Sequence, residues 1–116
     1  ATRTDATITK GRADIASIRS AIITERQGRL IKGDSAWITR ANLDTGGMFG
    51  GAMMYPIAAS TGDGWSSATA GDGTYVYTVG GTATNFTYYD STDATVSRRG
   101  TFVCTSGSGN CDLLVN

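Results

Sequence analysis

Residues 4–32 read TDATITKGRADIASIRSAIITERQGRLIK, and this stretch decides the fold class. It contains no proline, and its only glycines are Gly11 and Gly28. Apolar side chains recur at intervals of seven, three and four residues, which places them on one face of an α-helix. The predicted stripe consists of Ile8, Ile15, Ile18 and Ile22, with Ala13, Ala16 and Ala21 between them. The pattern predicts one long amphipathic helix over residues 1–33.

The C-terminal end of this helix is also marked in the sequence. Lys32 suits the negative end of the helix dipole, and Gly33 can adopt the left-handed conformation that follows many helices. Glu25 and Arg29 are spaced as an i,i+4 ion pair, which adds only about 0.2–0.5 kcal/mol. The N-terminal end carries no convincing cap.

The chain has 116 residues, the size of one small domain. Ten Lys and Arg balance ten Asp and Glu, so the net charge of zero gives no general attraction to nucleic acid or anionic membranes. The charges are unevenly distributed, because residues 1–40 carry eight basic and four acidic side chains, and residues 41–116 carry two and six. One interpretation is that the basic helix of one copy contacts the acidic region of another, in a head-to-tail assembly. The simpler interpretation is that charges cluster unevenly in a small protein.

Two cysteines, Cys104 and Cys111, lie close together in the sequence, and the chain has no histidine. Without a Cys/His cluster the sequence does not indicate a zinc site. A disulfide that closes a short loop is the simplest hypothesis and would imply an oxidising compartment, whereas two reduced thiols are the alternative. We expect no membrane-spanning segment within these residues, because no apolar run is long enough.

Residues 34–73 predict a packed connector. The segment is rich in large apolar side chains that must be buried, so we do not expect a flexible linker. Ala52–Ala59 favours a short helical turn, which Pro56 would interrupt. Two Gly-Asp-Gly triplets, at 62–64 and 71–73, are turn signals.

From Thr74 the pattern changes to that of β-strands. TYVYTV at 74–79 is a run of β-branched and aromatic residues, and Gly80-Gly81 supplies a tight hairpin turn. Two further runs, at 83–89 and 100–105, have the same character. Ser106–Asn110 is expected to form a Gly/Ser turn between the two cysteines.

The order of these elements predicts an α+β fold in one domain, residues 1–116. We expect a helix at 1–33, a packed connector at 34–73 and, at 74–116, an antiparallel sheet of three to four strands with a C-terminal disulfide loop. Asp112–Val115 is expected to finish the edge of the sheet. Because the helix has one apolar stripe and the sheet needs one face covered, the two should pack together.

Leu43-Asp44-Thr45-Gly46 matches the signature of aspartic proteases. That chemistry needs paired carboxylates on a rigid apolar base, and residues 38–42 are polar and mixed. We therefore interpret Asp44 as a turn or capping residue. With no histidine, no cysteine beside a base and no convincing carboxylate pair, the sequence indicates no catalytic residue and no cofactor site, and we do not expect an enzyme.

The remaining polar and aromatic candidates each have a simpler interpretation. Asp90 and Asp93 share one connection and are weak candidate ligands for calcium, although solvated turn residues are more common. Arg98 and Arg99 could contact DNA phosphates, but zero net charge makes DNA an unexpected partner. Aromatic residues on strands could build a sugar-binding platform, but more often they form a core. These aromatics are Trp65, Tyr75, Tyr77, Tyr88 and Tyr89.

One segment resembles a known family. KGRADIASIRSAI at 10–22, continued by TERQGRL at 24–30 and GDS at 33–35, resembles the helix of bacterial type IV pilin-like proteins and is most similar to type II secretion pseudopilins. The Cys104–Cys111 loop resembles the disulfide-bounded C-terminal region of true type IV pilins. The later landmarks that fit the group are Gly64-Trp65-Ser66, Tyr75-Val-Tyr-Thr78 and Gly100-Thr-Phe-Val-Cys104.

The resemblance implies a pilin-like fold and a hydrophobic helix that precedes Ala1, spans the inner membrane once and is processed and methylated by a prepilin peptidase. Such a helix would account for the missing N-terminal cap. The resemblance also implies a location at the periplasmic face of the inner membrane, or outside the cell for a true pilin. Its implied partners are copies of this chain, related pilin-like subunits and the inner-membrane assembly platform.

The function expected from the resemblance is that of a structural subunit of a type II secretion pseudopilus, a periplasmic fibre that drives protein export. The alternative is a type IV pilin or minor pilin for adhesion or DNA uptake. Arg12, Arg19 and Arg26 are the candidate contacts with acidic loops of neighbouring subunits.

Overall fold

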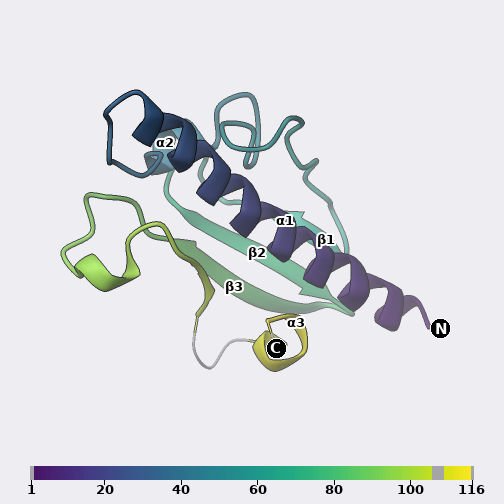
Figure 1. Ribbon diagram of the computed structural model, residues 1–116. Coiled ribbons are helices and arrows are strands. Elements are labelled where there is room, and N and C mark those ends of the chain that lie inside the picture. Colours follow the sequence, from purple (N-terminus) through teal and green to yellow (C-terminus); the bar gives the residue numbers. More distant parts are fainter. Residues whose placement is uncertain (1, 106–108, 116) are drawn as a thin grey trace.

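The computed structural model describes residues 2–105 and 109–115, and Figure 1 shows how its elements are arranged. One long helix, α1 (Arg3–Ile31), lies across one face of a four-stranded antiparallel sheet. This confirms the predicted α+β architecture. The strands are β1 (Gly64–Ser66), β2 (Thr74–Val79), β3 (Thr82–Tyr88) and β4 (Phe102–Cys104). The short helical elements are α2 (Arg40–Leu43), η1 (Val96–Arg98) and α3 (Cys111–Leu114).

Hydrogen bonds close both ends of α1. The Thr2 hydroxyl oxygen accepts a hydrogen bond from the Asp5 amide at 3.0 Å, and the Asp5 carboxylate accepts one from the Thr2 amide, so the two residues form a capping box. The expectation of an uncapped start is therefore wrong. At the other end the Asp34 amide donates to the Arg29 carbonyl oxygen, with Gly33 at φ 86°, in the predicted left-handed ending.

The sheet order is β1-β2-β3-β4, so each strand pairs with its neighbour in sequence. β2 and β3 form the predicted hairpin. Its turn residues, Gly80 and Gly81, have φ of 56° and 81°, and a two-residue turn with positive φ at both positions matches the right-handed twist of the strands. β1 comes from the connector, where the sequence predicts no strand, and pairs with β2 through Trp65 and Tyr77.

Aromatic side chains fill the space between α1 and the sheet. From the helix, Ile15, Ile18 and Ile22 pack against them, each at most 2% exposed. The sheet contributes Trp65, Tyr75, Tyr77, Phe86, Tyr88 and Phe102, all at most 1% exposed. The core interpretation of these strand aromatics is confirmed; Tyr89 is half-buried.

Two of the buried aromatic side chains donate hydrogen bonds to α1. The Tyr77 hydroxyl donates to the carbonyl oxygen of Thr7 at 2.6 Å, and the Trp65 indole nitrogen donates to the carboxylate of Asp14 at 3.0 Å. Gly11 allows this close approach, because a Cβ atom there would lie 2.5 Å from the ring of Tyr77. These contacts set the direction in which α1 crosses the sheet.

Two predictions about irregular segments are wrong. Ala52–Ala59 forms turns and one isolated bridge instead of a helical turn, while the connector's short helix is α2. Asp112–Val115 does not join the sheet, because its first three residues belong to α3, whose Leu114 is buried against α1. The predicted Ser106–Asn110 turn falls partly on residues 106–108, outside the described residues.

Cys104 and Cys111 form a disulfide, with their Cα atoms 5.8 Å apart, so the predicted pairing is confirmed. It joins the end of β4 to the start of α3. None of the helices in the described part of the chain has the length and hydropathy required to cross a membrane.

Candidate functional site

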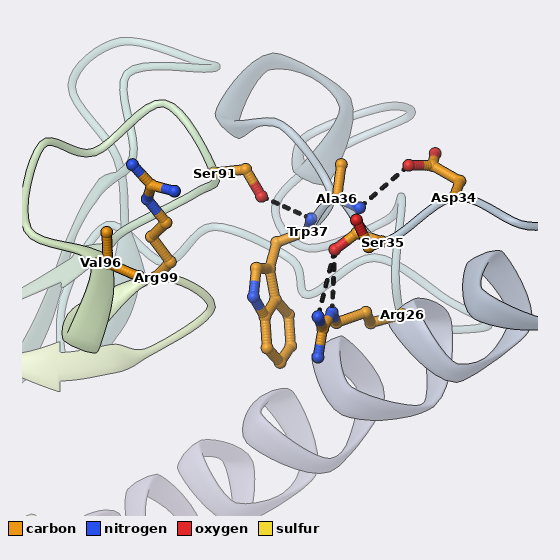
Figure 2. A pocket seen from close by; sticks show the side chains of 8 residues that line it. All are labelled: Arg26, Asp34, Ser35, Ala36, Trp37, Ser91, Val96 and Arg99. Carbon is orange, nitrogen blue, oxygen red and sulfur yellow. Dashed lines mark hydrogen bonds between the residues drawn. The ribbon is translucent and has the colours of Figure 1, made fainter.

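A cleft of about 540 Å³ lies where the C-terminal part of α1 meets the connection between β3 and β4 (Figure 2). One wall is formed by Arg26 of α1 and the segment 34–37 that follows the helix. The other wall is formed by Ser91, Val96 and Arg99 of the connection. We call this feature the arginine cleft, since an arginine stands in each wall.

Backbone contacts hold the helix-side wall in place. The Nε and Nη2 atoms of Arg26 both donate to the carbonyl oxygen of Ser35, each at 3.2 Å. The same guanidinium lies 4.3 Å from the centre of the Trp37 ring, a cation–π contact. The Trp37 amide donates to the Ser91 hydroxyl oxygen at 2.7 Å and so joins the two walls, as Figure 2 shows. Trp37 also packs against Gly100, where a Cβ atom would lie 2.3 Å from the ring.

The opposite wall is organised by Asp93. Its carboxylate accepts hydrogen bonds from the Arg98 guanidinium at 2.6 and 2.9 Å and from the Thr95 amide at 3.0 Å. The Arg98 contact, supported by that of Thr95, lowers the pKa of Asp93. The carbonyl oxygen of Asp93 accepts a hydrogen bond from Arg99 Nε at 2.8 Å, which places Arg99 in the cleft wall.

Asp90 ties the same connection to the connector. Its carboxylate accepts hydrogen bonds from the Arg40 amide at 3.0 Å and from the Thr92 amide at 2.9 Å. Burial raises the pKa of Asp90, but the hydrogen bonds from Thr92 and Arg40 outweigh this effect and leave the pKa below its ordinary value. The carboxylate oxygens of both calcium candidates therefore already accept hydrogen bonds from the chain. Among the described residues, no group of three or more His, Cys, Asp or Glu side chains is placed to hold a metal ion.

The three predicted contact arginines occur at intervals of seven along α1, so they share one flank of the helix. Arg12 is exposed near α3. Arg19 donates through Nε to the carbonyl oxygen of Phe102 in β4 at 2.9 Å. Arg26 lies in the arginine cleft. Arg19 and Arg26 thus also attach α1 to its own domain, which the sequence pattern does not reveal.

Asp44, in the protease-like tetrapeptide, serves a structural purpose. Its carboxylate accepts hydrogen bonds from the Tyr75 hydroxyl at 2.6 Å, the Gly71 amide at 2.7 Å and the Phe49 amide at 3.3 Å. Burial, with a contribution from Asp44, raises the pKa of Tyr75 far above that of a free phenol. Asp44 also follows α2 directly as its C-terminal capping residue, which confirms the turn-or-cap interpretation.

Sequence reasoning did not associate Trp37, Ser91 and Arg99 with one site. Trp37 is one of the large apolar side chains of residues 34–73 for which the sequence predicts burial, and Arg99 is half of a basic pair. A weak signal was available in the Asp90–Arg99 connection, where acidic side chains precede two arginines and can fold back to fix them. Nothing in the local pattern says that this connection meets the end of α1.

A scan against protein-family models and searches of curated proteins and of solved structures find no match for this chain.

Proposed function

We propose that this chain is a structural subunit of a type II secretion pseudopilus, which polymerises into a periplasmic fibre that drives protein export. The observation that carries the proposal is the arrangement of α1. The helix has 29 residues, and at 1.5 Å per residue it is about 44 Å long. Its buried stripe faces the sheet, and its opposite face is exposed. A long helix with one free face suits packing between copies.

The exposed face of α1 carries apolar side chains that are unusual for solvent contact. Ile23 is 49% exposed, Leu30 46% and Ile31 88%. In the proposed filament these side chains would be covered by neighbouring subunits, and their burial would contribute to assembly. The hydrophobic helix that the resemblance places before Ala1 would anchor the subunit in the inner membrane and contribute most of the assembly energy.

The proposed mechanism is mechanical. Subunits are taken from the inner membrane by the assembly platform and added to a growing fibre of this chain and related pilin-like subunits. Each addition pushes the fibre outward, and cargo protein moves ahead of it. The domain needs no catalytic residue for this role.

One observation favours the second candidate, a type IV pilin or minor pilin for adhesion or DNA uptake. The Cys104–Cys111 disulfide closes a loop near the C-terminus, like the disulfide-bounded region of true pilins. Such a subunit would be displayed outside the cell.

Electron microscopy of the full-length protein, expressed with its own assembly genes, tests both candidates. Short fibres confined to the periplasm and loss of export in a deletion strain are expected for a pseudopilin. Long surface fibres with export unchanged would indicate the pilin. An absence of this subunit from any fibre, with the protein folded and the assembly genes expressed, would contradict the structural role.

A further inference from the structure

The arginine cleft presents guanidinium nitrogens that the domain does not use. Arg26 is fixed through Nε and Nη2, and Arg99 through Nε. Within residues 2–105 and 109–115, no group accepts a hydrogen bond from Nη1 of Arg26 or from either Nη atom of Arg99. Both side chains are therefore held in position while part of each donor fork stays available. Planar forks of this kind match the two oxygens of a carboxylate.

The charge and shape of the cleft narrow the choice of ligand. The only carboxylate in its lining, that of Asp34, already accepts hydrogen bonds from Arg29 at 3.2 Å and from the Ala36 amide at 2.9 Å. The cleft thus favours an anionic group. The Trp37 ring packs against Arg26 and Gly100, which disfavours a sugar that needs an open aromatic face. An acidic side chain of a protein fits these features best.

The opposite end of the molecule presents such side chains. Asp63 directly precedes β1, at the end of the sheet where Gly64 pairs with Thr78. Asp112 lies in α3, which packs beside Gly11 of α1. Both aspartates are exposed, and no described residue donates a hydrogen bond to either carboxylate. Figure 1 shows β1 and α3 beside the N-terminal half of α1, whereas the β3–β4 connection lies toward its C-terminal half.

The separation of the two ends suits a head-to-tail contact. Gly11 and Arg26 are fifteen residues apart on α1, about 22 Å along the helix axis. A group at one end cannot reach the cleft of its own chain across that distance, but it can enter the cleft of another copy. Contacts between unlike ends repeat without closing and produce open fibres unless the rotation closes a ring.

We propose that the arginine cleft receives an acidic side chain, from Asp63 or Asp112, of a second copy of this chain. The inference rests on the proposed function, because it names the contact between successive subunits. The attraction between the cleft arginines and the aspartate acts only at contact range. At longer range it is weak, because the net charge is zero and the positive charges of Arg3 and Arg12 also lie near the acidic end.

Charge exchange in the full-length protein tests the contact through filament assembly. We expect Arg99→Glu to lower the yield of filaments about tenfold or more, because it places like charges together. Asp63→Lys with Asp112→Lys should do the same, and the three changes combined should restore most of the yield. Ser20→Glu, at an exposed position midway along α1 and away from both the cleft and the two aspartates, is the control and should leave assembly unchanged. Normal assembly of Arg99→Glu, or no recovery in the combined variant, would overturn the proposal.

A measurement on the present chain separates this inference from the filament proposal. A nitroxide label on Gly62→Cys, at a position where a Cβ atom meets nothing within 4 Å, sits beside Asp63. When this protein is mixed with isotope-labelled unmodified protein, the nitroxide should broaden the Trp37 indole resonance of the isotope-labelled copy. Introducing Arg99→Gln into the isotope-labelled copy should abolish the broadening. Near-UV circular dichroism would verify that this variant is folded. Broadening without filaments would keep the contact and remove the filament role. If filaments form, but the Trp37 resonance is not broadened and Arg99→Glu does not lower the filament yield, the filament role would stand and the proposed contact would be overturned.

Discussion

Replacement of Asp44 by alanine tests how the connector is held against the sheet. The carboxylate accepts hydrogen bonds from the Tyr75 hydroxyl, the Gly71 amide and the Phe49 amide. Tyr75 is 0% exposed, so its hydroxyl would lose its partner without gaining water, which costs about 1–3 kcal/mol. Each amide adds about 0.5–1.5 kcal/mol. We expect Asp44→Ala to lower the free energy of unfolding by roughly 2–6 kcal/mol.

The assay is urea unfolding followed by tryptophan fluorescence, with the disulfide intact. Tyr75→Phe is the matched control, because it removes one donor without leaving a buried group unpaired, and should cost about 1–2 kcal/mol. The double variant should be more stable than the sum of the single losses predicts, since the two groups share one hydrogen bond. If Asp44→Ala stays within about 0.5 kcal/mol of the unchanged protein, the assignment of Asp44 as the anchor of the connector is refuted.

Four other perturbations test the packing of α1, the disulfide and the β3–β4 connection. Gly28→Ala should stabilise α1 by up to about 1 kcal/mol, because nothing lies near its Cβ position, whereas Gly11→Ala should lower the thermal midpoint despite the same gain in helix propensity. Reduction of the Cys104–Cys111 disulfide should cost roughly 2–3 kcal/mol for a loop this short, measured by urea unfolding with and without reductant. Because the folded-state pKa of Asp90 is lowered, its contribution to the free energy of unfolding is present above the unfolded-state pKa and is lost as pH falls through the folded-state pKa. The free energy of unfolding of Asp90→Asn should therefore depend less steeply on pH between about pH 5 and pH 2 than that of the unchanged protein. Millimolar calcium should leave the thermal midpoint unchanged, since the carboxylate of Asp90 is already hydrogen-bonded within the chain, and a clear rise would support a calcium site.

The long helix and the central hairpin could be predicted because their signals are local. The isoleucine spacing of α1 repeats over several turns, and Gly33 at its end has the conformational freedom that the ending requires. Gly80-Gly81 allows a two-residue turn with positive φ at both positions. In each case the residues that determine the structure are neighbours along the chain, so the pattern survives without knowledge of the rest of the fold.

The short elements were beyond local prediction. α2 and α3 have four residues each and β1 has three, too few to show a period. Their conformations depend on contacts with distant partners: Asp44 meets Tyr75, and Leu114 fits beside Gly11. Helix propensity and turn preferences depend on neighbouring residues, so they cannot predict contacts between residues that are far apart in the sequence.

Local sequence patterns are sufficient to predict the fold class, the apolar stripe of α1, the β2–β3 hairpin and a pair of cysteines close enough to join. The contact between the end of α1 and the β3–β4 connection, which places Arg26 and Arg99 in the lining of one cleft, depends on tertiary packing. The physical reason is range. Periodicity and turn preference act between residues a few positions apart, whereas a site is assembled by packing, which brings together side chains that the sequence keeps far apart.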